Sequence, residues 1–400
     1  MSDESHDDAP ELLPALPPTA EPEIEAGGEL TEAYFSKELD AAIEERVNDF
    51  SQTLNIAVIG RVSCGKSSVI NALLRRDRSD QVSAVGAISG VTTSLTVLRL
   101  DDQVRIVDSP GLDDIVSDNS KVTRDFLRHV DVGIFVVTGS ADAGQRRHLA
   151  DLRKVCDSVF VVLNKVDEWD RHAPSARDKV IDQWKECLRI DAIYPTCAFG
   201  FDPDIDAEVP LDVRGIDELR ADMEDFLVER GKDLLLARHM GQKTTYALGI
   251  IAGALASVAG EAFIPGSGIY ITATQAAAIS ALYYLYTGRV LSKQSALAII
   301  PSFAARSAGA SLFLAVKSFL PPTGVIDAAA AAVAVVVTFA MLMTINTMLA
   351  NGHELHEQDV LRDTFKDHRA LARPAIAKTT PDDWRDPAFW KKVIHDVMYG

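Results

Sequence analysis

The chain has 400 residues, of which 47% are hydrophobic and 24% are charged, and its formal net charge at pH 7 is −18. This length favours two or three domains, and the composition excludes a disordered or collagen-like protein. The negative charge argues against a protein that binds nucleic acid through a broad basic face, so we expect no nucleic-acid partner.

The first part of the chain is acidic and polar. Residues 1–28 are rich in acidic residues and proline, which is typical of a disordered arm that serves either as a solubilising tail or as a docking tail. Residues 29–53 carry apolar side chains at helical spacing, which predicts a leading helix. The chain opens without a basic region and an apolar segment, and its four cysteines lack metal-ligand spacing, so we expect free thiols in a cytoplasmic protein.

Residues 54–230 alternate apolar, strand-like runs with segments of helical length. Strands are predicted at 54–59, 95–100, 104–107, 132–137, 159–164 and 193–196. The short turn at Asp101 and Asp102 predicts an antiparallel hairpin, and the longer connections predict right-handed crossovers between parallel strands. We therefore predict a doubly wound α/β domain with a mostly parallel sheet and one antiparallel edge strand.

A glycine-rich loop follows the first predicted strand and precedes a predicted helix. It matches the phosphate-binding pattern GxxxxGK[ST] and consists of Gly60, Arg61, Val62, Ser63, Cys64, Gly65, Lys66, Ser67 and Ser68. In such a loop, backbone N–H groups and the start of the helix bind phosphate oxygens. Lys66 would neutralise the β- and γ-phosphates, and the hydroxyl of Ser67 would bind Mg²⁺. The alternative is an ordinary turn of glycine and serine.

Two further segments are predicted to contact Mg²⁺ and the γ-phosphate. Asp108 follows the strand 104–107 and would hold Mg²⁺ through water, and the amide of Gly111 would face the γ-phosphate. Between this motif and the phosphate loop, Thr92 would bind Mg²⁺ and sense the γ-phosphate, with Thr93 as the second choice. The alternative for the threonines is that these β-branched residues merely begin a strand.

Base recognition is predicted at the ends of two later strands. Asn164, Lys165 and Asp167 follow the strand 159–163, and the Asp167 carboxylate can accept two hydrogen bonds from guanine that adenine cannot donate. Cys197 and Ala198 follow the last predicted strand, where a backbone N–H could bind the guanine O6, although a plain strand end explains them as well. The expected ligands are therefore GTP or GDP, with Mg²⁺.

These motifs look like those of the translation-factor-related P-loop GTPases. Leu112 stands where Ras-like enzymes have a water-positioning glutamine, and Ser63 with the doubled serine after Lys66 is similar to the dynamin-like signature. The chain thus resembles the bacterial Era-like and dynamin-like GTPases. The resemblance implies GTP hydrolysis that is stimulated when a homodimer or larger homo-oligomer forms, with Ser63 helping to place a monovalent cation. The catalytic residues that it implies are Lys66, Ser63, Thr92 and Gly111.

Arginines near the phosphate loop allow two interpretations. They are either solvated surface charges or fingers that act on the nucleotide of another subunit, and they comprise Arg61, Arg75, Arg76 and Arg78.

The remainder of the chain is apolar and then polar again. Residues 246–350 contain six charged residues and much alanine and glycine, and we predict a hydrophobic helical domain at 231–352 and C-terminal helices at 353–400. The apolar helices are predicted at 246–260, 262–288, 296–320 and 327–351. Membrane insertion would agree with the positive-inside rule, whereas Arg306 in the third helix counts against it. The alternatives are peripheral membrane contact and a buried or oligomeric bundle, and residues 386–398 form either an interfacial or a docked helix.

These observations lead to one main hypothesis and one alternative. The main hypothesis is a bacterial GTP-hydrolysing switch, at the cytoplasmic face of the inner membrane or inserted into it, whose nucleotide state controls the helical domain. Helices at 30–50 and 215–245 would act as levers. The alternative is a soluble GTPase scaffold or assembly factor whose apolar half is an oligomerisation core.

Overall fold

A computed structural model describes residues 52–75, 96–109, 130–201, 209–241, 243–263, 267–304, 325–376 and 379–399. The predicted acidic arm and nearly all of the predicted leading helix lie outside these residues. The contacts divide the chain into two compact units, with the boundary between Gln242 and Lys243. The boundary expected from the sequence was at residue 230. Each unit is described by itself.

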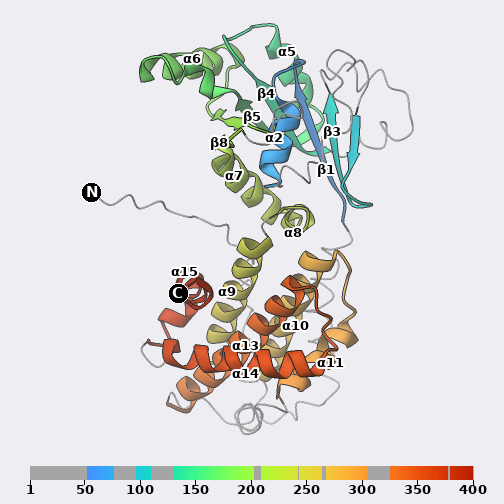
Figure 1. Ribbon diagram of the computed structural model, residues 1–400, viewed down its shortest axis with the longest axis vertical. Coiled ribbons are helices and arrows are strands. Elements are labelled where there is room, and N and C mark those ends of the chain that lie inside the picture. The colour runs from blue at the N-terminus through green and yellow to red at the C-terminus, as the bar shows by residue number, and fades with distance from the viewer. Residues whose placement is uncertain are drawn as a thin grey trace, which may run out of the picture. The chain divides into compact units, whose positions relative to one another are not determined.

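The first unit is built on a six-stranded sheet, shown in Figure 1. The strand order is β2-β3-β1-β4-β5-β6, from β1 (Leu54–Gly60), β2 (Thr96–Arg99), β3 (Val104–Ser109), β4 (Val130–Val137), β5 (Cys156–Leu163) and β6 (Tyr194–Pro195). Neighbouring strands are parallel except β2 and β3, which form an antiparallel pair at the edge. The predicted mostly parallel sheet with one antiparallel edge strand is therefore confirmed.

Strands β1 and β4 are buried at every position, because helices cover both faces of the sheet. One hydrophobic cluster joins side chains of the sheet to α5 (Gln145–Leu152) and α6 (Pro174–Leu188), with Trp184 of α6 fully buried. Helix α2 (Lys66–Leu73) contacts β1, and α7 (Ile216–Val228), which follows the last strand, contacts both α2 and β5.

One local prediction was wrong, and one feature was not predicted. The predicted helix at 215–245 is divided into α7, α8 (Asp233–Ala237) and the beginning of α9 (Lys243–Glu261). Gly231 adopts a φ of 64°, a left-handed conformation that ends a helix and that glycine adopts without a steric penalty. The structure also contains a small antiparallel pair, β7 (Cys197–Phe199) and β8 (Asp212–Arg214), that was not predicted. Strands of three residues are too short to show a periodic pattern.

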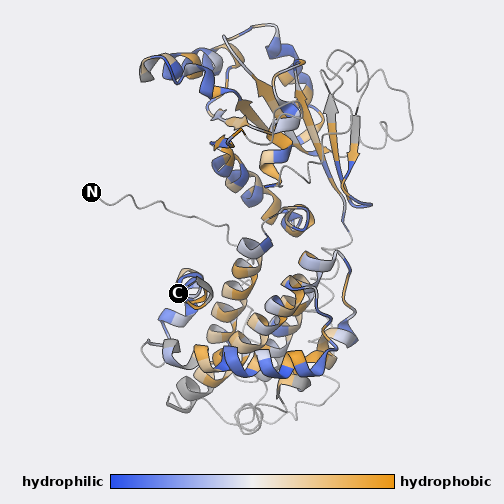
Figure 2. Ribbon diagram, viewed as in Figure 1, coloured by the Kyte–Doolittle hydropathy of each residue, from blue (hydrophilic) through white to orange (hydrophobic). Residues whose placement is uncertain are grey.

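The second unit is helical, as predicted. It contains α9 and the helices and short 3-10 turn that follow it, namely α10 (Ser267–Thr287), α11 (Lys293–Ala304), α13 (Val325–Ala350), α14 (Gln358–Ile376), η5 (Asp383–Arg385) and α15 (Pro387–Tyr399). Figure 2 shows that α9, α10 and α13 are largely apolar, whereas α14 carries a long hydrophilic stretch. Helix α9 packs against α10, α13 and α15, and α13 packs against α14. The apolar helices thus bury their side chains against one another.

Two pairs of polar side chains join α10 to α13. Gln275 Nε2 donates a buried hydrogen bond of 2.8 Å to Thr338 Oγ1, and Tyr286 OH donates a partly buried one of 2.8 Å to Asn346 Oδ1. Such pairs fix the register of two otherwise smooth apolar helices, because an unpaired polar group would be costly in the core.

Within the part of the chain that the structure describes, two helices are long and apolar enough to cross a membrane by length and composition alone. They are α9 and the segment Ala331–Ala350 of α13, and 67% and 78% of their most apolar windows are buried inside the protein. The third predicted apolar helix, at 296–320, is described as α11 up to Ala304, and Arg306 lies outside the described residues.

Candidate nucleotide-binding site

The phosphate loop runs from the end of β1 to the start of α2, at the carboxyl edge of the sheet. Two of its glycines are required by close packing. A Cβ atom on Gly60 would lie 2.3 Å from the Val136 carbonyl oxygen, and one on Gly65 would lie 2.3 Å from Asn164 Nδ2. Gly65 also has a φ of 82°. The sequence pattern of the loop is therefore explained by the approach of β4 and of the residue that ends β5.

Lys66 lies across the loop that precedes it. Its Nζ donates a hydrogen bond of 3.1 Å to the Arg61 carbonyl oxygen, and Ser63 adopts a left-handed φ of 64° between the two residues. The amide of Val69 donates to the Gly65 carbonyl oxygen, which closes the first turn of α2. The amides at the start of this helix and the Lys66 ammonium carry positive charge at one place, which suits a phosphate group.

Asn164 joins the phosphate loop to the predicted base-recognition loops. Its Nδ2 donates a hydrogen bond of 3.0 Å to the Cys64 carbonyl oxygen, and its Oδ1 accepts one of 3.3 Å from Thr196 Oγ1. The backbone N–H of Asn164 donates to the Val137 carbonyl oxygen. The sequence places Asn164 in the base-recognition motif but gives no sign of its contact with the phosphate loop.

Asp167 and Cys197 lie side by side. The Cys197 thiol donates a hydrogen bond, with 3.3 Å between Sγ and Asp167 Oδ1, and the Val166 amide donates to the Thr196 carbonyl oxygen. Burial raises the pKa of the Cys197 thiol to about 12, and the Asp167 carboxylate contributes to this shift. The thiol therefore stays protonated and can hold the carboxylate in one orientation. Ala198 is buried next to it, so the structure brings these predicted residues together.

Other predicted site residues are placed in part or not at all. Asp108 lies near the end of β3, in register with Val58 of β1, and thus at the same edge of the sheet as the phosphate loop. Residues outside the described part of the chain are Thr92, Thr93, Gly111, Leu112, Arg76 and Arg78.

A nucleotide-bound Mg²⁺ needs few protein ligands. It usually keeps several waters and takes one or two protein groups in addition to phosphate oxygens. Among the described residues, no group of three or more histidine, cysteine or acidic side chains could hold a metal by itself. Ser67, which follows Lys66 at the start of α2, and Asp108 are a donor set of the kind that Mg²⁺ prefers.

Two acidic side chains and one arginine that contact the phosphate loop or the carboxyl end of α2 were missed in the sequence. Arg61 forms an ion pair with Asp142, which follows β4, and Arg75 Nη2 donates to Asp217 Oδ1 at 2.8 Å. Arg220 of α7 donates to the carbonyl oxygens of Ala72 and Leu73, at 3.1 and 3.0 Å. Arg220 thus caps the carboxyl end of the helix whose other end forms the phosphate loop. No motif marks these residues, because their partners are distant in the chain.

The sequence matches known proteins over part of this unit. Residues 55–165 match the family described as 50S ribosome-binding GTPase. The chain is 44% identical over 66 residues to "Nuclear GTP-binding protein NUG1" of Saccharomyces cerevisiae, which covers 16% of this chain and 13% of that protein. It is 31% identical over 122 residues to "GTPase Era" of Clostridium kluyveri, which covers 28% of this chain and 40% of that protein. The chain therefore spans less than half the length of these curated relatives.

A solved structure that is similar to this chain is the G domain of the FeoB iron transporter of T. maritima. The TM-score is 0.27 at 17% sequence identity, and the match covers 44% of this chain and 99% of that domain. Together, the phosphate loop, the strand order around it and the family match show that this part of the chain has the fold of a P-loop GTPase.

Proposed function

We propose that this protein is a switch that binds and hydrolyses GTP. One observation carries the proposal: Asn164 bonds both to the Cys64 carbonyl oxygen in the phosphate loop and to Thr196 beside the base-recognition residues. The elements that would bind the triphosphate and the guanine are therefore parts of one site. Asp167, oriented by the Cys197 thiol, would select guanine over adenine.

Hydrolysis in this site would depend on positioning and on charge. Lys66 and the loop amides would bind the β- and γ-phosphates, and Ser67, Thr92 and Asp108 would hold Mg²⁺, which neutralises charge as the γ-phosphoryl group is transferred. The Gly111 amide would face the γ-phosphate. Because Leu112 follows Gly111 where Ras-like enzymes have glutamine, we expect slow basal turnover that rises when two GTPase units associate across the nucleotide face. A monovalent cation placed by Ser63 is part of this proposal.

The helical unit would be the output of the switch. The length and composition of α9 and α13 support association with the cytoplasmic face of a membrane, or insertion into it. A second candidate is a soluble assembly factor, and it is supported by the burial of the same helices against their neighbours and by the ribosome-binding description of the matching family. Both candidates use the same GTPase chemistry and differ in what the helical unit contacts.

The test is GTP turnover of the full chain as a function of its own concentration, with and without anionic liposomes, and in potassium or sodium salt. Turnover per molecule that rises with concentration supports self-association, and a further rise with liposomes supports the membrane proposal. Potassium-specific stimulation supports the monovalent cation. Recovery of all the protein in the soluble fraction after carbonate washing of cells, with no liposome effect, would favour the assembly factor.

Lys66→Ala is the matched loss-of-function variant. It removes the ammonium from the phosphate loop and should abolish GTP binding, as measured by calorimetry. Lys179→Ala is the control, because Lys179 is exposed on α6, away from the loop. Normal GTP affinity in the Lys66 variant would contradict the proposed site.

A further inference from the structure

The turn between β2 and β3 is organised by Asp101. One oxygen of this carboxylate, Oδ1, accepts hydrogen bonds from the backbone N–H groups of Gln103 and Val104, at 2.6 and 2.7 Å. These bonds fix the turn, so the carboxylate cannot change its position without moving the hairpin. The hairpin lies in the chain between Thr92 and Gly111, the two positions at which the γ-phosphate would be sensed.

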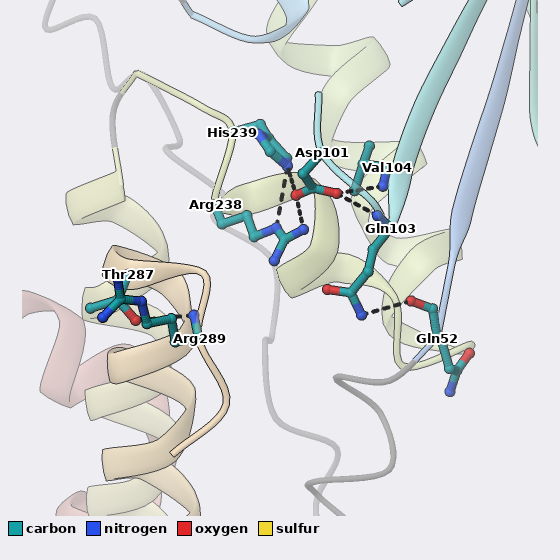
Figure 3. A network of polar contacts seen from close by, with 8 residues as sticks. All are labelled: Gln52, Asp101, Gln103, Val104, Arg238, His239, Thr287 and Arg289. Carbon is teal, nitrogen blue, oxygen red and sulfur yellow. Dashed lines mark hydrogen bonds and ion pairs between the residues drawn. The ribbon is translucent and has the colours of Figure 1, made fainter. Parts of the chain in front are cut away.

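The second oxygen of Asp101 holds the segment that leaves the GTPase unit. His239 Nε2 lies 2.6 Å from Asp101 Oδ2, and Arg238 forms an ion pair with the same oxygen. Figure 3 shows the Arg238 and His239 side chains converging on this carboxylate. Arg238 is buried, so its charge-assisted contact with Asp101 is shielded from solvent.

The same turn also holds the segment that enters the unit. Gln103 Nε2 donates a hydrogen bond of 3.1 Å to the Gln52 carbonyl oxygen, and the Gln103 carbonyl oxygen accepts one of 2.8 Å from the Leu54 amide. At the other connection, the Gly241 amide donates a hydrogen bond of 2.9 Å to the carbonyl oxygen of Leu74, directly after α2. The chain then continues from Gln242 into α9. Both connections of the GTPase unit are thus bonded to its end away from the phosphate loop, at the amino end of β3 and the carboxyl end of α2.

We propose that Asp101 couples the nucleotide state to the exit segment, residues 238–241, and through it to the start of α9. This coupling rests on the proposed function. Strand β3 runs from this turn to Asp108 at the nucleotide edge of the sheet, so a shift of the hairpin when GTP and Mg²⁺ bind at that edge carries Asp101. Because the carboxylate is bonded to the turn on one side and to Arg238 and His239 on the other, the exit segment follows or its ion pair breaks. A single carboxylate with two sets of partners therefore gives the exit segment two arrangements that the nucleotide selects.

Asp101→Asn tests this coupling in the full chain. The amide oxygen of asparagine still accepts from Gln103 and Val104, whereas the charge that binds Arg238 is lost. Asp102→Asn is the matched control, since Asp102 is the exposed neighbour in the same turn. The measurement is hydrogen exchange of residues 233–263 with GDP and with a non-hydrolysable GTP analogue, next to calorimetry of both nucleotides.

The expected result is a nucleotide-dependent difference in exchange at 238–241 in the wild type and in the Asp102 variant. This difference should be lost in the Asp101 variant, while its affinity for both nucleotides stays within about twofold. Arg238→Gln, which removes the charge from the other side, should give the same loss, and combining the two substitutions should add nothing.

Two outcomes would overturn the coupling alone: an exchange difference that persists in Asp101→Asn, or a wild type that binds both nucleotides but shows no difference at 238–241. A wild type that binds no GTP would overturn the proposed function, and the coupling with it. An Asp101 variant that is less stable but keeps the difference shows a merely structural ion pair.

Discussion

Asn164 and Cys64 are 100 positions apart in the chain, yet the side chain of the first donates a hydrogen bond of 3.0 Å to the main chain of the second. Both residues are buried. The contact joins Cys64 of the phosphate loop to the residue directly after β5, where the base-recognition residues begin. The shape of the phosphate loop therefore depends on a residue that a motif search assigns to the base.

Replacing Asn164 by aspartate should destabilise the phosphate loop, although the two side chains are nearly the same size. The new carboxylate oxygen would face the Cys64 carbonyl oxygen, so an acceptor meets an acceptor where a donor is needed. We expect a loss of about 1–3 kcal/mol in the free energy of unfolding and at least about tenfold weaker GTP binding. Denaturant titration and calorimetry measure the two effects. A variant as stable as the wild type would contradict the role of this bond.

Gly65→Ala and Gly139→Ala form a matched pair. Both glycines have left-handed φ values, 82° and 65°, but a Cβ atom on Gly139 meets nothing within 4 Å, whereas one on Gly65 would collide with Asn164. The Gly139 variant should lose only the backbone cost, about 1–2 kcal/mol, and should keep its nucleotide affinity. The Gly65 variant should lose nucleotide binding as well. Equal nucleotide affinity in the two variants, measured by calorimetry, would argue against a tightly packed phosphate loop.

Asp167→Asn should change the base that the site prefers. The amide that replaces the carboxylate can donate to the carbonyl oxygen of xanthine but cannot accept both guanine hydrogen bonds. We expect competition assays with GTP and XTP to show a shift toward XTP of about tenfold or more. Asp178→Asn, at an exposed position on α6, should leave the preference unchanged. Unaltered preference for GTP in the Asp167 variant would remove this residue from base recognition.

Glu224 should make the stability of the GTPase unit depend on pH. It is buried on α7, its Oε1 has no hydrogen-bond partner among the described residues, and burial raises its pKa to about 8, although Arg220 acts in the opposite direction. Between its ordinary pKa of 4.5 and about 8, the folded protein binds more protons at this site than the unfolded chain does. The stability contributed by this group therefore falls as pH rises through that range and is constant outside it.

Glu224→Gln removes the titrating group and keeps its shape. Relative to the wild type, the variant should gain about 1–3 kcal/mol in the free energy of unfolding between about pH 5 and about pH 9. Denaturant titrations at several pH values measure the gain, and Glu218→Gln, at an exposed position on the same helix, is the control. A stability difference that does not change with pH would show that Glu224 is charged in the fold throughout.

The strands and the phosphate loop were predictable because their signals are local. Buried parallel strands are continuous apolar runs, and the loop must combine glycines, a lysine and a serine at fixed spacing. The antiparallel pairing of β2 with β3 followed from the short turn at Asp101 and Asp102, and the parallel pairing of the other strands followed from the long crossovers. The break in the predicted helix at 215–245 was missed because a single glycine, Gly231, is tolerated in many helices, and only its left-handed φ shows that the helix ends.

What the amino-acid sequence determined by itself is the chemistry of the site: a loop for phosphates, a carboxylate for guanine and a sheet to carry them. The tertiary structure decided which distant residues hold that chemistry in place, namely Asn164 against Cys64, Arg220 on the carboxyl end of α2, and Asp101 against Arg238. The reason is physical. A motif records groups that must be close along the chain, whereas buried hydrogen bonds and ion pairs form between any groups that folding brings together, and they leave no periodic trace in the sequence.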